Sequence, residues 1–219
     1  MSKNSIVVFD IDGTLTDSIS QHQKAFERAL RRFPFPALRT EWSSYRHHSD
    51  SGIFVEAWED AGWSQTPDLA ALESYFQEEF DAVLEVDPID QIAGAATFLE
   101  LLRQTKWAPV FATGSLRHGA LRKLAALHTS FDENLLVTAS EYQTREEIVS
   151  NAILLANKEY SIASVDRVVS IGDGIWDLKT ARNLGIEFVG IGFGEKAERL
   201  ATLGATVHAG YRQGLAILG

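Results

Sequence analysis

The segment Asp10-Ile11-Asp12-Gly13 constrains this chain more than any other, because an apolar run ends there on two acidic residues and a glycine. The run before it, residues 6–9, is rich in β-branched side chains and predicts a buried strand. Side chains at i and i+2 of an extended segment point the same way, so Asp10 and Asp12 can face one site. Gly13 lets the backbone turn sharply or approach a ligand closely. We therefore expect a two-carboxylate site at the carboxyl end of a strand, the edge where open α/β sheets bind ligands.

Short apolar runs like this one recur along the chain, at residues 110–112, 135–137, 168–171 and 188–191. Helical patterns alternate with them, at about 88–105, 116–127, 146–158 and 178–184. This alternation predicts an α/β fold, a Rossmann-like doubly wound parallel sheet with crossover helices. For the glycine-rich residues 190–194 we expect no β–α–β unit behind them, and hence no nucleotide site.

The stretch from Thr16 to Val86 shows helical periodicity and no convincing strand, and it is too long for a loop. Ser18 and Gln21 have capping-box spacing, which predicts a helix start near them. We interpret this stretch as an inserted all-helical cap domain, residues 16–87. Residues 1–15 and 88–219 then form the α/β core.

Composition excludes several classes of protein. The fractions of hydrophobic residues, 45%, and charged residues, 23%, are those of a folded globular chain. The net charge of −10 leaves no basic stripe for nucleic acid, and the lack of cysteine excludes disulfides and thiolate metal sites. No run approaches the ~18 apolar residues of a membrane span. We expect a cytoplasmic monomer or homodimer without nucleic-acid or membrane partners.

A second acidic pair, Asp173 and Asp177, follows the predicted strand 168–171. Parallel strands would bring both acidic pairs to one edge of the sheet. At an effective dielectric constant of about 20, two like charges about 4 Å apart repel by roughly 4 kcal/mol. The cluster therefore needs protonation or a cation, and an all-oxygen set suits a hard ion such as Mg²⁺.

Two further elements suit an anion. Thr113 and Gly114 end the strand 110–112 just before a predicted helix, whose first amides can bind phosphate. Arg145 lies between Thr144 and Glu147, which have capping-box spacing and start another helix. Its guanidinium offers a fixed positive charge.

In order and spacing, these elements resemble the four motifs of the haloacid dehalogenase-like superfamily, namely Asp10-Ile11-Asp12-Gly13-Thr14, Thr113, Arg145, and Gly172-Asp173 with Asp177. The resemblance spans nearly the whole chain. The third motif is commonly a lysine, so Arg145 departs from the pattern. We place Arg145 in that role because Lys123 lies inside a predicted helix and Lys158 near the far end of another.

The resemblance implies that Asp10 attacks phosphorus to form an aspartyl-phosphate, while Asp12 protonates the leaving oxygen and then activates water. It implies a Mg²⁺ ion held by Asp10, the main-chain carbonyl of Asp12, and Asp173, with Asp177 in the outer shell. Thr113, Gly114 and Arg145 would hold phosphate oxygens. Further substrate contacts are expected from Thr16, His22, Arg46 and Gly114.

We therefore predict a magnesium-dependent phosphatase of a small phosphorylated metabolite. The aspartate at position 12 favours phosphoryl chemistry, because true dehalogenases lack it. A sugar-phosphate mutase of the same superfamily is the first alternative, and His22 on the first cap helix favours it. The second is a catalytically weakened binding or regulatory protein, which the altered third motif suggests.

Overall fold

The computed structural model describes residues 2–219 and contains a six-stranded parallel sheet of order β5-β4-β1-β6-β7-β8. Its strands are β1 (Ser5–Phe9), β4 (Trp107–Ala112), β5 (Leu136–Val137), β6 (Arg167–Gly172), β7 (Glu187–Ile191) and β8 (Thr206–His208). The central strand β1 pairs in parallel with both β4 and β6. The predicted Rossmann-like α/β core is confirmed.

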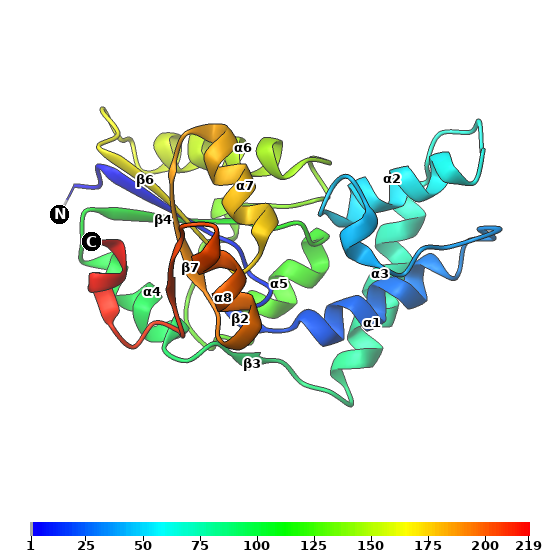
Figure 1. Cartoon of the computed structure of the whole chain (residues 1–219), viewed down its shortest axis with the longest axis horizontal. Helices are drawn as coiled ribbons and strands as arrows, with labels where there is room; N and C mark the ends of the chain where they lie inside the picture. The colour runs from blue at the N-terminus through cyan, green and yellow to red at the C-terminus, as the bar shows by residue number, and fades with distance from the viewer. Residues whose placement is uncertain (1) are drawn as a thin grey trace.

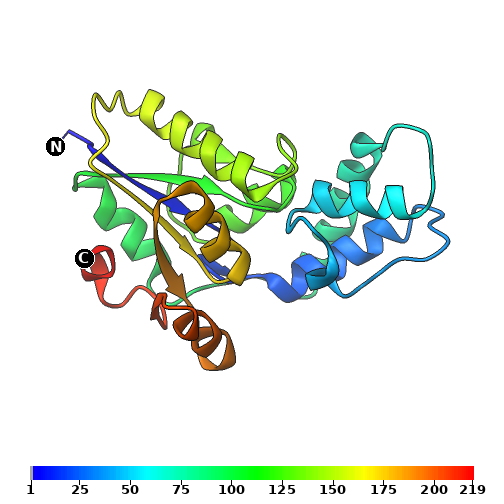
Figure 2. The ribbon, with the colours of Figure 1, turned by 45° about the horizontal axis from the view of Figure 1, so that its top comes forward.

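Helices cover both faces of this sheet (Figures 1 and 2). They are α4 (Ala95–Arg103) and α5 (Arg117–Ala125) on one face, and α6 (Arg145–Glu159) and α7 (Ile175–Leu184) on the other. Alternation along β1 explains the two layers, because Ile6 and Val8 pack in the cluster that includes α6, whereas Val7 and Phe9 pack in the one that includes α4. No helix within residues 2–219 has the length and apolar character needed to cross a membrane.

The last β–α–β unit was not predicted from the sequence. Helix α8 (Gly194–Thr202) follows β7 and leads to β8, which pairs in parallel with β7. The expectation that no such unit follows residues 190–194 was therefore wrong. Strand β8 has three residues at the edge of the sheet, which is too short for a periodic signal.

Between β1 and α4 the chain forms three inserted α-helices, α1 (Ile19–Leu30), α2 (Asp50–Asp60) and α3 (Leu69–Leu84). Two-residue strands β2 (Thr16–Asp17) and β3 (Asp90–Gln91) pair antiparallel where the chain leaves the sheet and returns to it. Both ribbon views place these helices together at one side of the sheet (Figures 1 and 2). The domain boundaries at residues 16 and 87 remain a prediction.

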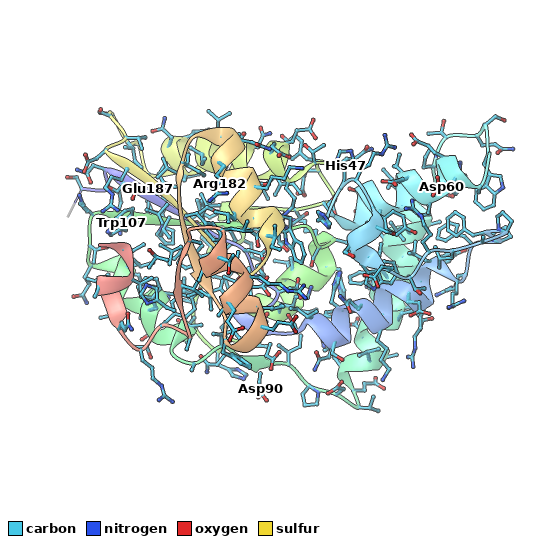
Figure 3. All side chains as sticks on the ribbon, in the orientation of Figure 1. His47, Asp60, Asp90, Trp107, Arg182 and Glu187 are labelled. Carbon is cyan, nitrogen blue, oxygen red and sulfur yellow. The ribbon has the colours of Figure 1, made fainter. Side chains whose placement is uncertain are left out.

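The carboxyl ends of the strands face the inserted helices. Trp107 and Glu187, the first residues of β4 and β7, lie at the far end of the sheet (Figure 3). His47 lies where the inserted helices approach the core, and Asp60 lies farther out (Figure 3). Side chains that follow the strands are therefore directed toward the junction between the core and the inserted helices.

Candidate active site

Three buried carboxylates meet at the carboxyl ends of β1 and β6. One side-chain oxygen from each of Asp10, Asp173 and Asp177 lies within 4.8 Å of the others. Asp10 directly follows β1, Asp173 follows β6, and Asp177 lies in the first turn of α7. The loop after β1 needs a glycine, because a Cβ on Gly13, whose φ is +73°, would lie 2.1 Å from Asp173 Oδ2.

Arg145 lies against this carboxylate cluster. Its Nη2 donates to Asp10 Oδ1 at 2.9 Å and also to Asp177 Oδ1. A capping box of Thr144 and Glu147 starts α6 at this point and so fixes the arginine in the first turn. Although burial lowers the pKa of Arg145, the charges of Asp177 and Asp10 raise it above its ordinary value, so the group stays cationic.

Two oxygens of the cluster fit a hard cation. Asp177 uses both of its oxygens, since Oδ1 accepts from Arg145 and Oδ2 accepts from the Gly174 N–H at 3.0 Å. Asp10 Oδ2 has only a 3.4 Å contact from Thr14, and no hydrogen bond within residues 2–219 reaches Asp173 Oδ1. Asp10 and Asp173 are therefore the carboxylates available to Mg²⁺, whereas Asp177 holds Arg145.

Without a metal ion, the ionised forms of Asp10 and Asp173 are destabilised. Burial raises the pKa of Asp10 well above its ordinary value; Arg145 opposes that rise, and Asp177 and Asp173 add to it. Burial and the neighbouring Asp177 also raise the pKa of Asp173 to about 6. A divalent ion would stabilise both ionised forms.

The Asp12 carboxylate points toward a different set of partners. Ser18 donates to its Oδ1 at 2.6 Å, and Ser115 and Lys123 each donate to its Oδ2 at 2.7 Å. Burial alone raises the pKa of Asp12, but the positive charge of Lys123 and the hydrogen bonds from Lys123 and Ser18 outweigh burial and hold this pKa below its ordinary range. The metal contact expected of the Asp12 main-chain carbonyl remains a prediction.

A cavity of about 440 Å³ opens between the carboxylate cluster and the inserted helices. Besides Asp10 and Asp12, the predicted site residues that line it are Thr113, Gly114, His22, Arg145 and Asp173. Its other wall includes Phe26, Trp42 and Ile53 from the inserted segment. The cavity is large enough for a small metabolite to lie with its phosphate against the cluster.

Two residues predicted to contact the substrate lie outside this cavity. Thr16 is buried in β2, where its hydroxyl donates to the carbonyl oxygen of Ile11 at 3.3 Å. Arg46 lines a neighbouring cavity of about 330 Å³ and forms ion pairs with Glu56 and Glu59. Substrate contact by either side chain remains a prediction.

The start of α2 docks directly on the core. The carboxylate of Asp50 accepts from the Leu116 N–H at 2.8 Å and hydrogen-bonds His22 Nε2 at 2.9 Å. The Asp50 N–H donates to the Gly114 carbonyl at 2.7 Å. A Cβ on Gly114 would lie 2.5 Å from the carbonyl oxygen of His48, so glycine permits this approach. The inserted helices are therefore closed onto the strand end that carries Thr113.

We expect Asp50→Asn to weaken this docking. An amide can accept only one of the two bonds, so the Leu116 N–H or His22 loses a partner in a buried place, at a cost of about 1–3 kcal/mol. The free energy of unfolding in urea should fall by that amount, and KM for p-nitrophenyl phosphate should rise. Asp60→Asn, at the exposed end of the same helix, is the matched control. Equal stabilities of the two variants would contradict the docking role of Asp50.

Three polar residues that the structure brings to this site were not among the predicted site residues. Ser115 and Lys123 bind Asp12, and Lys196 donates to Asp173 Oδ2. Lys123 shares a helix face with the buried residues Ala120 and Leu124, and a lysine on an apolar face is a detectable signal. Lys196 lies in the first turn of α8, which follows β7, so it arrives at the same edge of the sheet as Asp173.

Comparisons with known proteins agree with this architecture. The sequence profile of the haloacid dehalogenase-like hydrolases matches residues 5–185. A hydrolase from Pseudomonas syringae has 25% identity and a TM-score of 0.70, over 94% of this chain and 93% of that one. CbbY from Rhodobacter sphaeroides, solved with phosphate, has 18% identity and a TM-score of 0.70, over 98% and 99% of the two chains.

A third similar structure, from Bacteroides vulgatus, is proposed to be a beta-phosphoglucomutase, with 21% identity and a TM-score of 0.67, over 95% of this chain and 84% of that one. No curated protein matches the sequence.

Proposed function

Because the chain belongs to the haloacid dehalogenase-like hydrolase family, we propose that it is a magnesium-dependent phosphatase that hydrolyses a small phosphorylated metabolite through an aspartyl-phosphate. The observation that carries the proposal is the position of Asp10. Asp10 lines the cavity, its Oδ1 accepts from Arg145, and its Oδ2 has only a distant contact from Thr14. One oxygen is thus oriented and the other is available as a nucleophile.

In the first half of the proposed reaction, Asp10 Oδ2 attacks the phosphorus and the bond to the leaving oxygen breaks. Asp12, in the molecules in which it is protonated, supplies a proton to that oxygen and becomes a carboxylate. Arg145 and the groups around Thr113 and Gly114 hold the remaining phosphate oxygens, where charge is concentrated. Bound by Asp10 and Asp173, Mg²⁺ would neutralise charge on the phosphoryl group.

In the second half, water attacks the phosphorus of the aspartyl-phosphate, and Asp12 takes the proton of that water. The bond between phosphorus and Asp10 breaks, which frees the carboxylate and releases inorganic phosphate. We propose that residues 16–87 act as a cap whose closure excludes bulk water during both halves. The docking of Asp50 on Leu116 supports this role.

The proposed activity is tested with p-nitrophenyl phosphate over a magnesium titration. We expect release of p-nitrophenol and inorganic phosphate that depends on Mg²⁺ and is lost when EDTA removes the ion. Mg²⁺ should also raise the thermal unfolding midpoint, because it binds only the folded carboxylate cluster. Full turnover in EDTA-treated, metal-free protein would contradict the metal dependence.

A sugar-phosphate mutase is the alternative enzyme. His22 lines the cavity and lies in the hydrogen-bond network of Asp12, and the fold is similar to the beta-phosphoglucomutase proposed in Bacteroides vulgatus. Incubation with hexose phosphates separates the two activities. Release of inorganic phosphate supports the phosphatase, whereas an isomeric sugar phosphate without release supports the mutase.

A binding or regulatory protein without turnover is the alternative from another class. The altered third motif suggested it, but the contact of Arg145 with Asp10 supports retained catalysis. Such a protein would bind Mg²⁺ and release no phosphate from any substrate of a phosphometabolite panel. We also propose a cytoplasmic monomer or homodimer without nucleic-acid or membrane partners.

A further inference from the structure

Lys123 is a fully buried lysine at the junction between the core and the inserted helices. Its side chain has 0% exposure, and its Nζ lies 2.7 Å from Asp12 Oδ2, 2.7 Å from Ser115 Oγ and 2.9 Å from His22 Nδ1. Its partners do not include Asp10, the proposed nucleophile, which accepts a hydrogen bond from Arg145 instead. The site therefore contains one cation for the nucleophile and a separate one for the proposed acid–base residue.

The donors and acceptors of this network match completely. An ammonium group has three N–H donors and no acceptor, and Lys123 has three partners. Because Lys123 only donates, His22 Nδ1 must accept, which leaves the Nε2–H of His22 to donate to Asp50 Oδ1. Ser115 accepts from Lys123 and donates to Asp12. The network has one consistent proton arrangement.

This network connects the inserted helices to the core. His22 belongs to α1 and Asp50 to α2, whereas Lys123 belongs to α5. The bond between His22 and Lys123 can form only when the inserted helices are closed onto α5. The environment of the Asp12 carboxylate is therefore complete only in the closed arrangement.

We propose that Lys123 is a positioning residue, which holds the Asp12 carboxylate in place for attack of water on the aspartyl-phosphate and makes that placement depend on the inserted helices through His22. The inference rests on the proposed function, since it gives Asp12 a reaction step to serve. Asp12 follows β1 in a loop, and its three side-chain donors come from three different parts of the chain. Without Lys123, one oxygen keeps a single serine donor and the carboxylate is free to turn.

The test measures the two halves of the reaction separately. With p-nitrophenyl phosphate the leaving group departs without a proton, so the first half needs little help from Asp12 and the second half needs it fully. Stopped-flow release of p-nitrophenol gives the rate of the first turnover, and the steady state reports the second half. We expect Lys123→Met to increase the ratio of first-turnover rate to steady-state rate by about tenfold or more.

Controls distinguish positioning from folding. Methionine nearly matches the length of lysine, so the variant removes the charge and not the volume. A loss of folded molecules would lower the burst amplitude and the steady-state rate by the same factor, so the steady-state rate is divided by that amplitude. Lys106→Met removes an exposed lysine paired with Asp166 and should leave the ratio unchanged. His22→Ala, which keeps both charges of the buried pair, should increase the ratio in the same direction by a smaller factor.

Chemical rescue gives a second measurement. The chain contains no cysteine, so Lys123→Cys carries a single thiol. Alkylating that thiol with 2-bromoethylamine in denaturant and refolding the chain restores an ammonium group of nearly the original length. We expect the modified chain to regain the parental ratio, and the unmodified one to keep the increased ratio.

Unchanged ratios in both Lys123→Met and His22→Ala would overturn the inference, as would failure of the aminoethyl group to restore the parental ratio. The proposed function fails differently. If it is wrong, the parental protein releases no phosphate, or Asp10→Asn and Asp12→Asn remain active. A parental enzyme that requires Asp10 and Asp12 but tolerates Lys123→Met leaves the proposed function intact and removes only the role of Lys123.

Discussion

Asp10→Asn is expected to abolish phosphatase activity while leaving the fold unchanged. The amide cannot attack phosphorus, and loss of a nucleophile lowers kcat on the order of 10⁴-fold or more. Burial raises the pKa of Asp10, so its charge costs folding free energy above its ordinary pKa, and a neutral asparagine removes that cost. Steady-state turnover of p-nitrophenyl phosphate and the thermal unfolding midpoint together check the expectation.

The matched control for this variant is Asp90→Asn, the same change on the exposed strand β3. It should alter neither turnover nor the unfolding midpoint, because surface substitutions usually stay within about 0.5 kcal/mol. The midpoint of Asp10→Asn should equal or exceed the parental one. Activity of Asp10→Asn within tenfold of the parental protein would remove Asp10 as the nucleophile.

Arg145→Met should lower both stability and activity. Removing the guanidinium leaves the buried carboxylates of Asp10 and Asp177 without their cation, and breaking a buried pair in this way costs about 3–5 kcal/mol. The loss of a group aimed at phosphate charge should lower kcat/KM by about 10²–10³-fold. Urea unfolding with and without Mg²⁺ should show that the ion restores part of the stability, since it neutralises the same carboxylates.

Arg145→Lys tests whether the commoner lysine of the third motif serves here. A lysine keeps the charge but lacks the planar guanidinium, so we expect activity between those of the parental protein and Arg145→Met. Arg167→Met, which breaks a partly exposed pair with Glu187 at the far end of the sheet, is the control for loss of an arginine. If Arg145→Met were no less stable than Arg167→Met, the cation would not be holding the cluster together.

The residues that follow strands could be placed from the sequence because strand geometry is local. The apolar runs predicted β1, β4 and β6, and parallel pairing then put Asp10, Thr113 and Asp173 at one edge. Arg145 was also predictable in position, because the capping box of Thr144 and Glu147 fixes where α6 begins. These inferences needed only periodicities of two and of 3.6 residues and a capping rule.

Contacts made across helices could not be read in this way. Lys123 lies in the middle of α5. The residues next to it in the sequence do not predict that α1 and the loop after β1 pack against that face of the helix. The same holds for Asp50, whose partners are separated from it by tens of residues. Strand β8 was missed for a related reason, since an edge strand of three residues depends on β7 for its definition.

The sequence by itself determined the α/β sheet, the inserted helices and which acidic residues end the strands, because these follow from local backbone preferences and from the burial of alternating side chains. Only the tertiary structure decided that Arg145 hydrogen-bonds Asp10 while Lys123 hydrogen-bonds Asp12. It also decided that Asp50 docks the inserted helices onto the core. Those pairings depend on how separate helices pack together. Packing selects among many partners of similar charge, and the order of residues along the chain does not encode that choice locally.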